Sequence, residues 1–338
     1  MERLGNNAAR VFVQPFPTVT GFIGSTKWGL DLNGNPVTSN STFQAAILAL
    51  RTPNGRNGSY PWNSPFPWST LLNKFSSVTQ AIYRSNENTI NSLRSIGVKN
   101  ILIAQHIGSS SSSVSFTFST LDTSNSTYWT EAWELYRFSY AEAYWAWSKG
   151  ISLIEFYNEP DLQLGSTMNY LQYLQYYFIR CLSIQNLYSD MNSANPNSQV
   201  PVNIVASAFA RSTFGGDTTQ YLGDITVNNN GLMFPNLNTT EPGWRNFHTY
   251  SYHSYGASGQ SMFNTLNQTV TSVNDSSIPV IITEHNSKTS STWNTLTTTA
   301  DDFKEAAQLA SQIAFLLLGQ IFLMQGKIMN FLKKKLPR

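Results

Sequence analysis

The chain has 338 residues, of which 41% are hydrophobic and 12% are charged, and its net charge is +2 at pH 7. This length suits one large α/β barrel domain with long loops, and the small net charge provides no broad field to attract nucleic acid or an anionic membrane. The single cysteine, Cys181, excludes an internal disulfide and a cysteine-based zinc cluster.

Several features bear on where the protein acts. Six N-x-[ST] sequons favour a secreted glycoprotein; they begin at Asn40, Asn57, Asn125, Asn238, Asn267 and Asn274. The first ten residues lack the apolar region of a signal peptide, so we expect an extracellular protein whose signal peptide is not present in this chain. The apolar segment 313–324 is shorter than the roughly 20 residues that cross a bilayer, and no membrane span is predicted.

Short β-branched runs alternate with helical segments along the chain, which predicts parallel strands joined by crossover helices. The predicted strands are 11–13 or 19–23, 47–51, 98–104, 151–157, 202–207, 247–254 and 278–283. The predicted helices are 89–96, 128–149, 168–189, 260–273 and 300–318. This order predicts an α/β fold of the (β/α)8 TIM barrel type.

The domain organisation follows from the same pattern. No linker separates two halves, so residues 1–338 are predicted to form a single catalytic barrel domain, with 24–77 as long loops at the barrel mouth. The eighth strand is missing from the pattern, since the atypical tail 321–338 lacks a β-branched run and carries three consecutive lysines. We therefore expect the chain to be a truncated or altered version of a longer protein.

Two glutamates come directly after predicted strands. Glu159 follows the strand at 151–157 and Glu284 follows the strand at 278–283. Active sites of such barrels lie at the carboxyl ends of the strands, and period-two alternation puts Glu155, Tyr157 and Glu159 on one face. Retaining cleavage of a glycosidic bond needs two carboxyl groups about 5–5.5 Å apart, one as acid/base and one as nucleophile. The pair predicts that chemistry.

Two motifs carry a family resemblance. The segment 157–161, Tyr-Asn-Glu-Pro-Asp, resembles the strand-four signature of the clan A glycoside hydrolases, and 282–285, Ile-Thr-Glu-His, resembles their strand-seven nucleophile motif. The resemblance spans about 89–318 and implies Glu159 as general acid/base and Glu284 as nucleophile. Within the clan, the segment 283–318 looks most like agarase and xylosidase-type families.

The same resemblance implies substrate-binding residues. Asn158 would contact the sugar 2-hydroxyl, and the segment 247–256 would place His253 and Tyr255 near the nucleophile. Arg51 would be the strand-two arginine of the clan.

Other residues were assigned from their sequence positions. His106, just past a strand, and Trp293, in a polar loop, are candidates for sugar binding, although His106 fits a hydrogen-bonded loop histidine equally well. Glu155 is expected to be a structural carboxylate inside the barrel, hydrogen-bonded there. Asp161 is expected to interact with free amides at a helix start.

These observations predict an extracellular retaining glycoside hydrolase that cleaves β-glycosidic bonds of a polysaccharide or oligosaccharide, without cofactor or metal. Its partner is the carbohydrate substrate; the sequence does not name the sugar or the oligomeric state. One alternative is a carbohydrate-binding barrel protein with weak or no catalysis. A barrel lyase or aldolase is disfavoured, because no strand-end lysine is placed to form a Schiff base and no carboxylate cluster is spaced for a metal.

Overall fold

The computed structural model describes residues 8–13, 29–56, 77–105, 118–160, 169–207, 213–214, 217–218, 249–255 and 280–286. The chain divides into two compact units, Met1–Tyr250 and Ser251–Arg338. The predicted helices at 260–273 and 300–318 and the tail 321–338 lie outside the described residues. The single-domain organisation stays a prediction.

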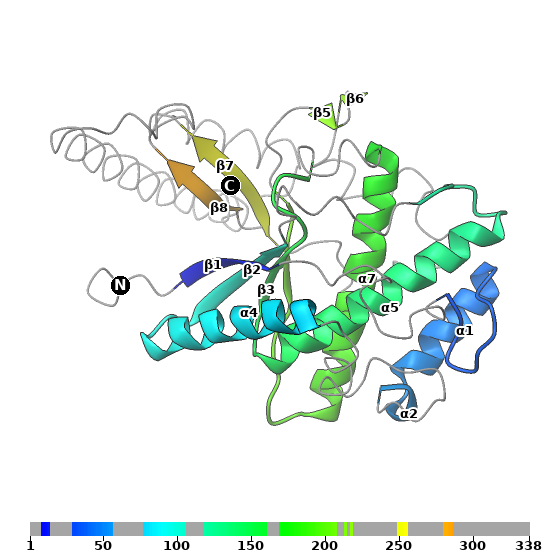
Figure 1. The fold of residues 1–338 in the computed structure, drawn as a ribbon, viewed down its shortest axis with the longest axis horizontal. Helices are drawn as coiled ribbons and strands as arrows, with labels where there is room; N and C mark the ends of the chain where they lie inside the picture. The colour runs from blue at the N-terminus through cyan, green and yellow to red at the C-terminus, as the bar shows by residue number, and fades with distance from the viewer. Residues whose placement is uncertain are drawn as a thin grey trace, which may run out of the picture. The chain divides into compact units, whose positions relative to one another are not determined.

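The first unit contains a four-stranded parallel sheet whose strands pair in chain order (Figure 1). The strands are β1 (Ala8–Val13), β2 (Asn100–Gln105), β3 (Leu153–Glu155) and β4 (Asn203–Val205). A parallel bridge from Val205 to Thr249 continues the pairing beyond β4. The predicted strands at 11–13, 98–104, 151–157 and 202–207 are thus confirmed, and the α/β class with them.

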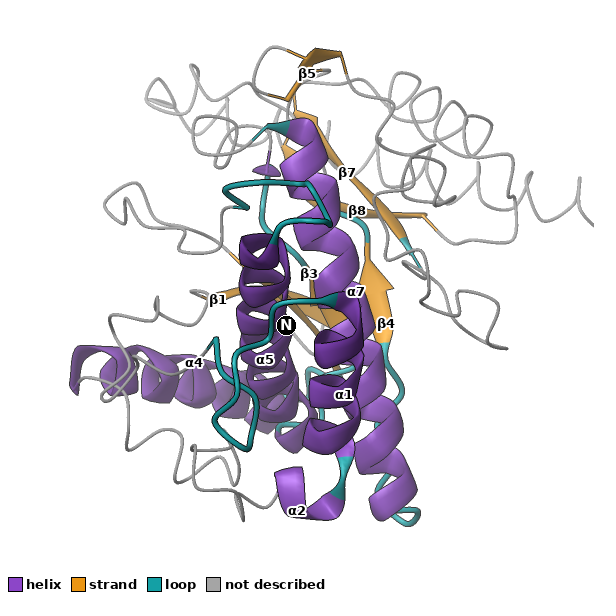
Figure 2. Ribbon diagram, turned by 90° about the vertical axis from the view of Figure 1, so that its right-hand side faces the viewer, coloured by secondary structure: helices purple, strands orange, loops and turns teal. Residues whose placement is uncertain are grey.

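Helices lie along one side of this sheet (Figures 1 and 2). They are α4 (Ser77–Ser95), α5 (Ser126–Ser148) and α7 (Tyr170–Ala194). Helix α1 (Asn40–Arg51) packs on α5 and α7 farther from the sheet, and the short α2 (Pro53–Arg56) contacts α1. Asn125 and Asn169 cap α5 and α7 through side-chain oxygens that accept hydrogen bonds from backbone amides. The predicted helices at 89–96, 128–149 and 168–189 are confirmed, and each is longer at one end or both.

The predicted strand at 47–51 is wrong, because these residues form the second half of α1. The buried residues of α1 are Phe43, Ala46, Ile47 and Leu50, which recur at the three- and four-residue spacing of a helix. A capping box between Ser39 and Thr42 starts the helix. The loops predicted for 24–77 therefore include helical segments.

Two further strand pairs are present. A small antiparallel pair that the sequence analysis did not predict joins β5 (Thr213–Phe214) to β6 (Asp217–Thr218). Strands β7 (Tyr250–Tyr255) and β8 (Val280–Asn286) form a two-stranded sheet, at the predicted strands 247–254 and 278–283. The sequence analysis placed Glu284 directly after the strand. Because β8 continues to Asn286, Glu284 instead lies within the strand.

Glu134 on α5 makes the stability of this unit depend on pH. Burial, followed by the nearby charge of Glu131, raises the pKa of the Glu134 carboxyl to about 7, compared with about 4.3 in an unfolded chain. The folded state therefore binds more protons between these values, so the contribution of this carboxyl to stability is fully present below about pH 4 and is lost as the pH rises to 7. We expect Glu134→Gln to stabilise the protein by about 2 to 3 kcal/mol at pH 8 and by little at pH 4. Urea unfolding at both pH values measures this difference; an equal effect at the two would contradict it.

Candidate active site

Arg10 of β1 is hydrogen-bonded to Glu155 at the end of β3 and to Asn158, three residues farther along the chain. Its Nε and Nη2 donate to Oε2 of Glu155 at 3.0 and 2.8 Å, and Nη2 also donates to Oδ1 of Asn158 at 2.9 Å. The side chain of Glu155 is fully buried and that of Arg10 is 11% exposed. The buried carboxylate thus has a cationic partner with two donors, as the cost of burying a charge requires. The prediction that Glu155 is hydrogen-bonded in the interior is confirmed, and its place inside a barrel stays a prediction.

The strand register explains how Arg10 reaches across the sheet. Neighbouring strands lie about 4.8 Å apart, so a side chain of β1 must pass over β2 to reach β3. Ala104 of β2 pairs with Glu155 of β3 and has only a methyl group at this point. Arg10 itself lies in register with Leu102 of β2, so its side chain reaches Glu155 diagonally, two residues along the sheet as well as across β2.

The backbone beyond β3 has an unusual conformation. Tyr157 has φ 53° and Glu159 has φ 49°, and among the described residues these are the non-glycine positions with positive φ. Left-handed backbone costs on the order of 1 kcal/mol or more at such residues and is concentrated at functional sites. The segment that carries Glu159 is therefore held in place by its surroundings.

This conformation breaks the alternation expected from the sequence. Glu155 reaches Arg10 across the sheet, whereas Tyr157 is 2% exposed and contacts Tyr176 on α7, with ring centroids 5.5 Å apart. The prediction that Glu155, Tyr157 and Glu159 share one face of the strand is wrong for Tyr157. The left-handed turn at Tyr157 sends its ring toward the helix layer.

Asn158 lies between the two left-handed residues and is 6% exposed. Because a guanidinium only donates hydrogen bonds, the amide oxygen of Asn158 must face Arg10. The Nδ2 group is then the donor directed elsewhere. Glu159 itself is partly exposed, so solvent or a ligand reaches this residue.

The remaining predicted site residues are less fully described. Glu284 lies in β8, and His253 and Tyr255 lie in β7, but the directions of these side chains are outside the description. His106 and Trp293, like Asp161, lie outside the described residues. The predicted 5–5.5 Å between the carboxyl groups of Glu159 and Glu284 stays a prediction.

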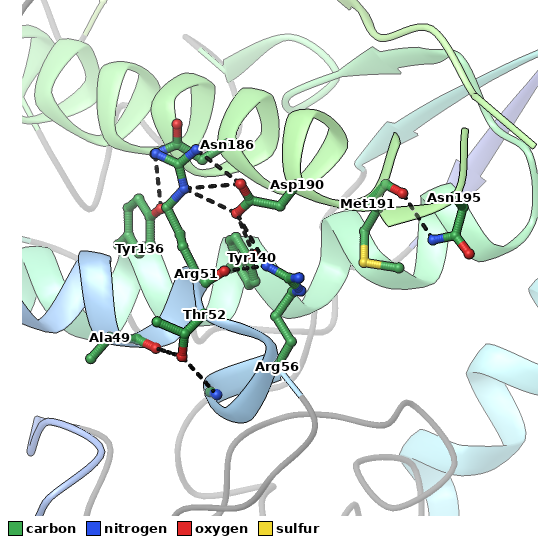
Figure 3. A network of polar contacts seen from close by, with 11 residues as sticks. Ala49, Arg51, Thr52, Arg56, Tyr136, Tyr140, Asn186, Asp190, Met191 and Asn195 are labelled. Atoms are coloured by element: carbon green, nitrogen blue, oxygen red, sulfur yellow. Dashed lines mark hydrogen bonds and ion pairs between the residues drawn. The ribbon is translucent and has the colours of Figure 1, made fainter. Parts of the chain in front are cut away.

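Arg51 lies at the end of α1, and its guanidinium binds Asp190 of α7 (Figure 3). Nε and Nη2 donate to the two carboxylate oxygens at 2.9 Å each, and the Tyr140 hydroxyl donates to the same carboxylate at 2.8 Å. Arg56 forms a longer ion pair with it. The assignment of Arg51 as a strand-two arginine is wrong, since the residue belongs to a helix and links two helices.

We expect Arg51→Ala to reduce the free energy of unfolding by about 1 to 2 kcal/mol, because a bidentate bond to a partly buried carboxylate is lost. Denaturant unfolding measures this loss. The glycoside hydrolysis predicted from the sequence should then be the same for the folded variant as for the wild type. A raised KM at unchanged stability would instead support a role in substrate binding.

Sequence reasoning missed Arg10. The predicted strand began at Val11 and left Arg10 out, whereas β1 starts at Ala8 and Arg10 is its only charged residue. A charged side chain in the middle of a buried strand needs a buried partner of opposite charge. That argument calls for a buried carboxylate but does not single out Glu155 among the acidic residues of the chain.

Comparison with protein-family models, curated proteins and solved structures found no match. Within the described ranges, no group of three or more His, Cys, Asp or Glu residues is arranged to hold a metal ion. None of the helices in that same part of the chain has the length and apolar character needed to cross a membrane.

Proposed function

We propose that the protein is a retaining glycoside hydrolase built on a (β/α)8 barrel, with Glu159 as the general acid/base and Glu284 as the nucleophile. The observation that carries the proposal is the strained Tyr157–Glu159 turn at the carboxyl end of a parallel strand, with Asn158 oriented by Arg10. Catalytic residues of α/β barrels come from such strand ends.

The strand order supports the barrel. Strands β1 to β4 are parallel and pair in chain order, and the segment leading into β7 pairs in parallel with β4. With the predicted strand at 47–51 removed, β3 is the third of the described strands counted from the amino terminus, and not the fourth as predicted. Among the described strands, and leaving aside the two-residue strands β5 and β6, the strand of Glu284 is the third after β3, following β4 and β7. Strand seven follows strand four by the same interval in clan A enzymes.

The reaction is a double displacement. A Glu284 carboxylate oxygen bonds to the anomeric carbon as the glycosidic C–O bond breaks, and Glu159 gives its proton to the leaving oxygen. Water then attacks the anomeric carbon, its proton passes to Glu159, and the bond to Glu284 breaks. The net change is hydrolysis with the β configuration kept. Asn158 would donate from Nδ2 to the sugar 2-hydroxyl, because its Oδ1 accepts from Arg10.

The proposed substrate is a β-linked polysaccharide or oligosaccharide of the agarose or xylan type, met outside the cell. An extracellular location agrees with the sequons. The sequon residue Asn125 is exposed at the start of α5, and its Oδ1 accepts from the Thr127 amide at 2.9 Å. A glycan on Nδ2 would leave this cap intact.

A 2-deoxy-2-fluoro glycoside with a good leaving group tests the function. The fluorine slows both steps, and the leaving group restores the first, so a glycosyl-enzyme accumulates. Peptide mass spectrometry should find the label on Glu284. Binding of the oligosaccharide without turnover or label, across β-galactosides and β-xylosides, would favour the carbohydrate-binding alternative.

A further inference from the structure

A buried polar network connects the helix layer to the strand end. Arg180 of α7 donates to Glu142 of α5 and to the hydroxyl of Tyr176, one turn earlier on α7. The Tyr176 hydroxyl is also hydrogen-bonded to Tyr157. Arg180, Tyr176 and Tyr157 are each at most 3% exposed, so this chain of contacts lies inside the protein.

Arg180 also holds the residue before Tyr157. Its guanidinium carbon lies 4.9 Å from the ring centroid of Phe156 and 5.3 Å from that of Tyr176. A planar cation over aromatic rings in a desolvated site is an attractive contact that fixes the orientation of both groups. Arg180 therefore contacts Phe156 directly and Tyr157 through Tyr176, and these two residues immediately precede Asn158 and Glu159.

Charge balance keeps the network intact. Burial alone lowers the pKa of Arg180, but Tyr176 and Glu142 raise it overall, so the guanidinium stays protonated. For Tyr157 and Tyr176 burial has the opposite effect and raises the pKa, so both hydroxyls keep their protons. The charged groups that face these tyrosines are Arg180 and Glu142.

The backbone at Tyr157 and Glu159 needs such support. Both residues are left-handed, a conformation that persists only when the surrounding structure enforces it. The Tyr157 side chain is held through its ring and through its hydroxyl, both by Tyr176. These contacts therefore hold the left-handed backbone two residues before Glu159.

We propose that Arg180, acting through Tyr176 and Tyr157, is a positioning residue that sets the location of the Glu159 carboxyl. It touches no substrate and acts only through the left-handed turn. The catalytic part of this inference rests on the proposed function, whereas the positioning of Glu159 does not.

The chain offers a matched control. Tyr188 lies on the same helix, is 1% exposed, and donates its hydroxyl to the carbonyl of Ile151 at 2.6 Å, just before β3. Tyr176→Phe and Tyr188→Phe therefore each remove one buried hydroxyl between α7 and the β3 segment. The Tyr176→Phe variant loses a contact to Tyr157, after β3, whereas Tyr188→Phe loses a contact to Ile151, before β3.

The first measurement does not need activity. Protein labelled with ¹³C at the glutamate carboxyl carbons is titrated by NMR, and Glu159→Gln assigns the Glu159 signal. We expect Tyr176→Phe to shift this signal and its titration midpoint, while Tyr188→Phe, destabilised to a similar degree, leaves both unchanged. Identical Glu159 titrations in the wild type and both variants would overturn the inference.

The second measurement uses hydrolysis. Tyr176→Phe should lower kcat by about ten- to a hundredfold on substrates whose leaving group needs a proton, with KM nearly unchanged, because a misplaced acid is costly. The loss should be small for an activated leaving group. Arg180→Lys keeps the charge but not the planar stacking, so it should fall between the wild type and Tyr176→Phe. Equal kcat losses on both kinds of leaving group would overturn the positioning role.

The two measurements separate the possible failures. If the wild type hydrolyses no β-glycoside, the proposed function fails, and the NMR titration still decides whether the network positions Glu159. If the wild type is active and Tyr176→Phe behaves like Tyr188→Phe in both measurements, the inference alone fails.

Discussion

Glu284→Ala is expected to abolish hydrolysis. The value of kcat should fall by on the order of 10⁴- to 10⁶-fold, because the residue that forms the covalent bond to the sugar is lost. Azide should restore turnover, because the small anion fits the space left by the carboxylate and attacks the anomeric carbon directly. The product would then be a glycosyl azide of inverted configuration. Steady-state kinetics and NMR of the product measure both effects.

Glu159→Ala is the complementary half of this experiment. It removes proton donation, which contributes about 10²- to 10⁴-fold, so only substrates whose leaving group needs no proton should retain turnover. Glu87→Ala is a suitable control, since Glu87 forms a partly exposed ion pair with Lys149 on the helix layer, and its activity should match the wild type. Azide rescue in Glu159→Ala and not in Glu284→Ala would mean that the two roles are reversed.

Much of the α/β arrangement could be predicted because several segments have one consistent pattern. The aromatic-rich segment around α5 is long, and a glycine, Gly150, follows it; β2 is a short continuous apolar run between turn signals. The prediction of a strand at 47–51 was wrong for a physical reason. Four consecutive apolar residues, 47–50, fit a strand and a helix face equally well, and the cap at Ser39 that decides between them lies eight residues earlier.

The candidate site was predictable only in part. A strand-end glutamate and a buried structural carboxylate follow from position and polarity, and Glu155 has the predicted environment. The left-handed turn at Tyr157 does not follow, because it depends on contacts with α7, a helix that comes later in the chain. The pairing of Arg10 with Glu155 joins residues 145 positions apart, and no local pattern encodes it.

Arg10→Ala is expected to be the most destabilising substitution near the site. It leaves the fully buried carboxylate of Glu155 without its cation, and breaking a buried ion pair from one side costs about 3 to 5 kcal/mol. The Asn158 amide also loses the donor that fixes its orientation. Urea unfolding measures the loss, and binding of substrate should weaken in the fraction that stays folded.

A double replacement shows whether the charge is the cause. In Arg10→Met with Glu155→Gln, no buried charge remains, so most of the lost stability should return, because neutral groups of similar size replace the pair. Substrate binding should stay impaired, since Asn158 still lacks the arginine that holds its Oδ1. If the double variant is as unstable as Arg10→Ala, the role of Arg10 is packing across Ala104 and not neutralisation of Glu155. If it regains wild-type binding, Asn158 does not need Arg10 to be oriented.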